Sequence, residues 1–215
     1  MDPSRGDNSL SPSVLQSDAT PAPDALQPRT SDTQDLSDPG SVIFVGGAGD
    51  QNSAIVYREY ERFKFARPDV PSKYFSHDEN RAISNYIKTL PDGAPVTLIG
   101  HSWGGDTAAQ VALSLPKRIT RFITVDPVGA LTPWLHSYDA IAKSVGKWTN
   151  VSAQPGEEQT FGDFIARRGG RWGTGPSGAE HNFVTLNGHH DDFSRMLNQL
   201  NSYQTLINGK RAGAR

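Results

Sequence analysis

The stretch V-T-L-I-G-H-S-W-G-G-D, residues 96–106, decides how the rest of the chain is interpreted. Its apolar start predicts a buried strand over 96–99, and the small residues that follow predict a helix over 103–115. Ser102 then lies on the tight turn between them, with a glycine two residues away on each side. Because such a turn brings other main-chain segments very close, a Cβ at either glycine would collide with them. The pattern therefore predicts a serine whose hydroxyl group is presented at the end of a strand.

Short apolar segments alternate with helical patterns on both sides of this turn. Further strands are predicted at 41–46, 73–76, 120–125 and 147–153. Further helices are predicted at 53–66, at 80–90, within 135–145 and at 191–207. Residues 155–189 are rich in glycine and predict no clear element. The alternation favours an α/β fold, in which a mainly parallel sheet carries helices on both faces. In such a fold the functional sites lie beyond the carboxyl ends of the strands.

The 215 residues fit one domain with a sizeable core, preceded by a segment of different composition. Residues 1–40 hold no aromatic residue but six of the fifteen prolines. Such a segment cannot bury enough apolar surface to offset the entropy lost on ordering, so we predict a disordered leader, with a docking or export segment as the alternative. The folded domain is expected at 41–208 and a flexible tail at 209–215.

Composition excludes several classes of protein. A formal net charge of −2 gives no electrostatic reason to expect a nucleic acid as partner. The absence of cysteine excludes disulfides and cysteine nucleophiles. No apolar run approaches the ~20 residues that span a bilayer, and the N-terminus lacks the apolar core of a Sec-type signal peptide. We expect no integral membrane segment, and a protein that is cytoplasmic or exported without a Sec-type signal.

The segment Val96–Leu113, with G-H-S-W-G fitting the pattern Gly-x-Ser-x-Gly, resembles the nucleophile elbow of the α/β-hydrolase family, of the lipase and esterase kind. The resemblance is close over this segment and looser over 41–208. It implies a compact α/β-hydrolase fold without a large lid, and a nucleophile at Ser102. It also implies that an acid and then a histidine follow the serine along the chain, and that no cofactor takes part.

The same resemblance implies an oxyanion hole with two main-chain donors. One is the N–H of the residue after the serine, Trp103. The other comes from the loop after an early strand, here F-V-G-G-A-G-D at 44–50, with Gly47 and Ala48 as the two alternatives. A phosphate-binding loop is the competing interpretation of this glycine-rich segment, but the Lys-Ser/Thr that completes a P-loop is missing.

Asp126 is the expected acid. It follows the strand at 120–125, and Asp-Pro there resembles the acid position of the pancreatic-lipase type. Most α/β-hydrolases carry the acid one strand later, where Glu157 and Glu158 are the alternatives. A structural role for Asp126, as the cap of a local turn, is the competing interpretation.

The histidine is expected in the loop before the last helix, where N-G-H-H-D-D-F occupies 187–193. His190 is the preferred base, with His189 and His181 as alternatives. A metal site made from these three histidines is not expected, because their spacing matches no standard ligand motif.

These residues predict a serine hydrolase that cleaves carboxylic esters, as a lipase, a phospholipase A or an esterase does. The alternatives are a thioesterase or acyltransferase on the same scaffold, and a hydrolase-fold binding protein without turnover. The substrate is expected to be a small acyl ester or a lipid, with an acyl pocket lined from 159–175 and a small flap within 131–145. Similar small lipase-like domains occur as bacterial effectors, which implies an immunity or delivery partner if this chain is one of them.

Overall fold

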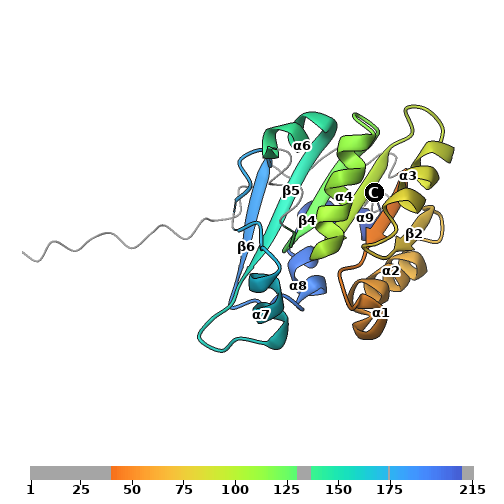
Figure 1. Ribbon diagram of the computed structural model, residues 1–215. Helices are drawn as coiled ribbons and strands as arrows, with labels where there is room; N and C mark the ends of the chain where they lie inside the picture. The colour runs from red at the N-terminus through yellow and green to blue at the C-terminus, as the bar shows by residue number, and fades with distance from the viewer. Residues whose placement is uncertain (1–39, 130–136, 174, 210–215) are drawn as a thin grey trace, which may run out of the picture.

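The computed structural model describes residues 40–129, 137–173 and 175–209 (Figure 1). The predicted leader, apart from its last residue, and the predicted tail after its first residue lie outside these ranges. So does the first part of the predicted flap, residues 131–136. Within the described ranges, no helix combines the length and apolar character needed to cross a membrane.

The core of the protein is a parallel sheet of six strands in the order β2-β1-β3-β4-β5-β6. The strands are β1 (Ser41–Val45), β2 (Ser72–Phe75), β3 (Val96–His101), β4 (Ile119–Val125), β5 (Val145–Gln154) and β6 (His181–Leu186). The register pairs Gly100 with Val45 on one side and with Thr124 on the other. The segments that follow β1, β3 and β4 therefore emerge side by side at one edge of the sheet. The predicted α/β class is confirmed.

Helices cover both faces of this sheet, as predicted (Figure 1). One face carries α2 (Ile55–Ala66), α8 (Phe193–Asn198) and α9 (Asn201–Asn208), and the other carries α3 (Asn80–Thr89), α4 (Trp103–Ser114) and α6 (Tyr138–Ser144). Two further helices are α1 (Asp50–Ser53) and α7 (Phe161–Arg168), which lie toward the same end of the sheet. Alternation along β1 shows why two cores form: Val42 and Phe44 pack on the first face, Ile43 and Val45 on the second.

The observed elements differ from the expected ones in three places. The helix expected at 53–66 is divided at Ala54, whose φ of 54° lies in the left-handed region. The helix expected at 191–207 is two helices, because Leu200 is extended, with φ −82° and ψ 119°. Leu200 is fully buried, so the apolar spacing continues across the break and the period alone conceals it. The segment 155–189, for which no element was expected, contains α7 and β6.

Candidate active site

Ser102 lies on a strained turn between β3 and α4. Its φ of 54° and ψ of −131° are unusual for a residue with a side chain, and its exposed fraction is 8%. A Cβ on Gly100 would lie 2.5 Å from the carbonyl oxygen of Gly104, and a Cβ on Gly104 would lie 2.3 Å from that of Val45. Both positions therefore require glycine, and for the reason that the sequence indicates.

The structure brings Ser102, His190 and Asp126 into one line of contacts. His190 Nε2 lies 2.9 Å from Ser102 Oγ, and His190 Nδ1 lies 2.6 Å from Asp126 Oδ2. Asp126 is fully buried, and its other carboxylate oxygen accepts a hydrogen bond from the N–H of Ala153 at 3.1 Å. A carboxylate that accepts from Nδ1–H leaves Nε2 free to accept from the serine hydroxyl group. The arrangement can therefore move a proton from Ser102 to the imidazole.

His101, the last residue of β3, supports the loop that carries His190. The two rings stack with their centroids 4.7 Å apart, and His101 Nε2 bonds to the carbonyl oxygen of His190 at 2.8 Å. Burial, aided by the neighbouring His190, lowers the pKa of His101 to about 4. At neutral pH His101 is therefore uncharged and donates this hydrogen bond from Nε2–H.

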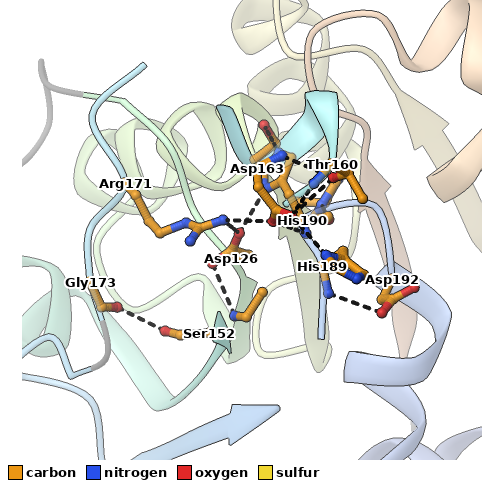
Figure 2. A network of polar contacts seen from close by, with 12 residues as sticks. Asp126, Ser152, Thr160, Asp163, Arg171, Gly173, His189, His190 and Asp192 are labelled. Atoms are coloured by element: carbon orange, nitrogen blue, oxygen red, sulfur yellow. Dashed lines mark hydrogen bonds and ion pairs between the residues drawn. The ribbon is translucent and has the colours of Figure 1, made fainter. Parts of the chain in front are cut away.

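The alternative bases lie elsewhere. His189 turns its Nδ1 to Asp163 at 2.8 Å, and its N–H donates to Asp192 at 3.0 Å (Figure 2). His181 is the first residue of β6, so it lies at the amino end of a parallel strand, whereas Ser102 follows the carboxyl end of β3. Only His190 of these three histidines contacts the serine.

The alternative acids lie apart from this line of contacts. Glu157 and Glu158 are exposed residues of the segment after β5. Asp126, in contrast, directly follows β4, has φ of 42° and donates its own N–H to Val151 at 2.6 Å. The parallel register places it beside the turn after β3, since Val125 pairs with His101.

The expected oxyanion donors surround Ser102. A Cβ on Gly47 would lie 2.6 Å from Ser102 Cβ, so the main chain of this loop runs directly against the serine. Gly46 donates its N–H to Phe75 in the sheet, whereas Gly47 and Ala48 line the cavity together with Gly49 and Asp50. Trp103 is the first residue of α4, and the first N–H groups of a helix have no intrahelical acceptor.

A cavity of about 540 Å³ opens over the serine. Of the expected acyl-pocket segment, Phe161 and Ile165 line the cavity, together with Ile55. Trp172 instead packs in the core against α6 and β5, and Phe164 does not line the cavity. In the described part of the chain, no cluster of three His, Asp or Glu side chains is arranged to hold a metal ion.

Two charged residues near the site have no counterpart in the sequence predictions. Asp163 on α7 accepts a hydrogen bond from the N–H of His190 at 2.8 Å, and Arg171 Nη2 lies 2.9 Å from Asp126 Oδ2. Both belong to the glycine-rich segment in which no element was expected. One signal was readable: Thr160 and Asp163 form a capping box, whose S/T-x-x-D/E spacing marks the start of a helix.

The sequence is similar to proteins of known family. A sequence model of the alpha/beta hydrolase fold family matches residues 58–175. A curated relative, a probable 1-acylglycerol-3-phosphate O-acyltransferase of Oryza sativa subsp. japonica, is 34% identical over 113 residues. That match covers 51% of this chain and 27% of the relative, so the chain spans about a quarter of the length of the curated relative that it matches.

Solved structures show a similar fold. A serine hydrolase involved in carbazole degradation, the CarC enzyme, has a TM-score of 0.51 at 10% identity, covering 78% of this chain and 91% of that chain. A hydrolase of the alpha/beta superfamily from Xanthomonas campestris pv. campestris has a TM-score of 0.46 at 17% identity, covering 79% and 96%. At 10% identity, the likeness to the first of these shows a shared fold and nothing finer.

Proposed function

Because the chain belongs to the alpha/beta hydrolase fold family, we propose that it is a serine hydrolase that cleaves carboxylic esters through an acyl-enzyme on Ser102. The observation that carries this proposal is the unbroken line of contacts from Ser102 through His190 to Asp126. Ser102, at one end of this line, opens on a cavity large enough for a small ester or one acyl chain. In this proposal the three residues are nucleophile, general base and orienting acid, and the enzyme is a lipase, a phospholipase A or an esterase.

In the first step, Ser102 Oγ attacks the ester carbonyl carbon while its proton passes to His190 Nε2. A C–O bond forms, and the carbonyl π electrons move to the oxygen. Asp126 keeps the imidazole in the required tautomer through Nδ1–H and stabilises the imidazolium by its charge. The full burial of Asp126 strengthens this interaction, because little water competes with it.

The oxyanion formed in this step is held by main-chain donors. We assign these to the N–H of Trp103 and to one N–H of the Gly47–Ala48 pair. The N-terminus of α4 adds the positive end of its helix dipole. Each such donor contributes ~10²–10³ to the rate of acyl transfer.

Collapse of this intermediate breaks the bond to the alcohol, which takes its proton from the imidazolium of His190. The acyl group stays on Ser102. Water, deprotonated by His190, then attacks the acyl carbon. His190 returns this proton to Ser102 Oγ as the bond between Oγ and the acyl carbon breaks and the carboxylic acid leaves. The apolar side chains around the cavity, Ile55, Trp103, Phe161 and Ile165, favour an acyl chain over a charged or sugar group.

Acyl transfer to an alcohol is the second candidate, and one observation favours it. The 34% identical relative is named as a probable acyltransferase, although this chain spans only about a quarter of it. An acyl-enzyme on Ser102 would serve both reactions, and only the group that attacks it differs. Hydrolysis of an ester in the presence of rising glycerol separates the two: formation of an acylglycerol favours transfer, and release of free acid alone favours hydrolysis.

A fluorophosphonate probe tests the proposed nucleophile. The wild type should be labelled and Ser102→Ala should not, because the probe reacts with an activated serine. In an assay with p-nitrophenyl esters of rising chain length, His190→Ala should lose nearly all turnover, whereas the matched control His181→Ala should keep most of it. Equal labelling of wild type and Ser102→Ala would contradict the assignment. An unlabelled, inert wild type would favour the binding-protein alternative, and turnover of acyl-thioesters alone would favour a thioesterase.

A further inference from the structure

A second buried carboxylate lies directly behind His190. The side chain of Asp163 is only 1% exposed. One of its oxygens accepts the N–H of His190 at 2.8 Å, and the other accepts from His189 Nδ1 at 2.8 Å and from the N–H of Thr160 at 2.9 Å (Figure 2). Asp163 thus connects the start of α7 to His189 and His190, the two histidines of the loop after β6, which is called the histidine loop below.

Arg171 connects this carboxylate to Asp126. Its Nη2 lies 2.9 Å from Asp126 Oδ2 and 3.5 Å from Asp163 Oδ1, and Figure 2 shows the side chain directed toward both. Within the described part of the chain, Nη2 has these two ion-pair contacts but no hydrogen bond of good geometry. Arg171 therefore acts on the two carboxylates mainly through its charge.

The main chain on both sides of Arg171 is held firmly beside Asp126. Arg171 itself forms an antiparallel bridge with Val128. Gly129 donates its N–H to Gly170 at 3.0 Å, and Trp172 donates its N–H to Pro127 at 3.0 Å. The guanidinium group is therefore placed by the same segment that leads away from Asp126, and not by a free surface loop.

The chemistry explains why a cation is needed at this position. Two buried carboxylates beside one histidine both favour its protonated form, because a nearby opposite charge stabilises the imidazolium. An imidazole that is already protonated cannot accept the proton of Ser102, and a nearby cation opposes that protonation. In the described part of the chain, the charged groups in contact with His190 or with its carboxylate partner are Asp126, Asp163 and Arg171. Asp50 and Asp191 line the same cavity as His190, and His101 is neutral near pH 7.

We propose that Asp163 and Arg171 are positioning residues of the active site. Asp163 fixes the main chain of His190, and Arg171 offsets the joint charge of Asp163 and Asp126, so that His190 is not held protonated and stays able to accept the proton of Ser102. The inference rests on the proposed function, because it assigns these roles for a reaction in which His190 gains and loses a proton. Since Phe161 and Ile165 of α7 line the cavity, Asp163 also links the cavity wall to the histidine loop.

The test compares the pH dependence of kcat/KM, for a p-nitrophenyl ester, in variants of the full chain. Arg171→Gln removes a positive charge near the imidazole, so protonation of His190 becomes easier. The acid limb of the profile, where kcat/KM falls because His190 is protonated, should therefore move up by about one pH unit. Asp163→Asn removes a negative charge, so the acid limb should move down. Both should lower kcat by roughly 10-fold or more while KM changes less than about 2-fold.

Arg171→Lys is the conservative variant, because it keeps the charge, and it should restore the acid limb and most of kcat. Arg81→Gln, an exposed arginine on α3, is the matched control and should leave both unchanged. A purely structural role would lower the amount of folded protein without moving the acid limb in opposite directions. If Arg171→Gln does not fold, Asp163→Asn and Arg171→Lys still decide the question.

The outcomes separate the two proposals. An active wild type whose Arg171→Gln and Asp163→Asn variants keep the wild-type pH profile overturns this inference and leaves the proposed function intact. The proposed function is overturned, and this inference with it, if the wild type hydrolyses no ester. The same holds if its ester hydrolysis is unchanged in Ser102→Ala. This inference is supported if the acid limb moves up in Arg171→Gln, moves down in Asp163→Asn and stays at the wild-type position in Arg171→Lys.

Discussion

The two loops that meet at Ser102 are each held by one buried aspartate, but in different ways. Asp50, after β1, accepts the N–H of Val56 at 2.9 Å, the N–H of Tyr57 at 3.2 Å and the hydroxyl of Tyr74 at 2.7 Å. Its nearest partners are thus six and seven residues along the chain. Asp163 instead holds a loop that lies 26 and 27 residues away, and it requires a cation nearby.

In the first case, residues close in the sequence hold the loop. In the second case, only the tertiary fold brings the aspartate to the loop that it holds. Asp50 caps the start of α2, a task that short polar side chains perform near their own position in the chain. Asp163 also caps its own helix, but in addition it reaches the loop that carries His190, which follows another strand. We therefore expect substitutions on the Asp50 side to act mainly on stability and on the oxyanion loop, and substitutions on the Asp163 side to act on proton transfer.

The largest expected effect is that of Gly47→Ala on the Asp50 side. The added Cβ would lie 2.6 Å from Ser102 Cβ and 3.1 Å from Ser102 Oγ, so either the loop or the serine must move. Losing one oxyanion donor should lower kcat by ~10²–10³. Steady-state kinetics, with Gly175→Ala as control because its Cβ would meet only Asn182 at 3.9 Å, measures this effect. An unchanged kcat would show that this loop holds no oxyanion.

The next effect is that of Asp50→Asn on stability. The amide cannot accept from all three donors that the carboxylate satisfies, so one buried group loses its partner. The free energy of unfolding should fall by about 1–3 kcal/mol, measured by urea denaturation. Tyr74→Phe in a double-mutant cycle gives the part that passes through the hydroxyl group. If Asp50→Asn moved the acid limb of kcat/KM as Asp163→Asn is expected to, the distinction between the two loops would be wrong.

The smallest effect concerns the pH dependence of stability. Desolvation raises the pKa of Asp163, but hydrogen bonds from Thr160, His189 and His190 outweigh it and lower the pKa to about 2. A carboxyl whose pKa is lowered by folding stabilises the protein above its unfolded value of about 4, and this contribution is lost as the pH falls through about 2.

Between pH 4 and pH 2, the wild type should therefore lose on the order of 2 kcal/mol of unfolding free energy that Asp163→Asn does not lose. Urea denaturation at several pH values measures the difference between the two proteins. Asp92→Asn, whose side chain is fully exposed beside Arg118, is the matched control and should follow the wild type. If the unfolding free energies of wild type and Asp163→Asn changed in parallel with pH, the hydrogen bonds to Asp163 would contribute nothing to the pH dependence of stability.

The sequence was sufficient where the deciding interactions are local. The turn at Ser102 requires glycines two residues on either side, and the apolar runs mark β1, β3 and β4 directly. Asp126 follows from its place after a strand, and the confirmed parallel sheet brings strand ends together. The sequence preferred His190 but left His189 and His181 open, because neighbouring side chains in a loop point in directions that only the surrounding structure determines.

The sequence was insufficient where distant segments decide. Asp163 and Arg171 lie in a stretch rich in glycine, and only the fold brings them to Asp126 and His190. The capping box at Thr160 could have indicated the start of α7, but not that its carboxylate also reaches another loop. The break at Leu200 was hidden because that residue is buried in register with its neighbours.

The strand order has a consequence for the life of the newly made chain. Ser102 follows the central strand β3, whereas His190 follows the edge strand β6 and is made 88 residues later. A ribosome therefore releases the serine-bearing half of the sheet well before the imidazole exists. Under the proposed function, an incomplete polypeptide carries the attacking oxygen without its proton acceptor, and stays inert toward cellular esters until its last strand has docked.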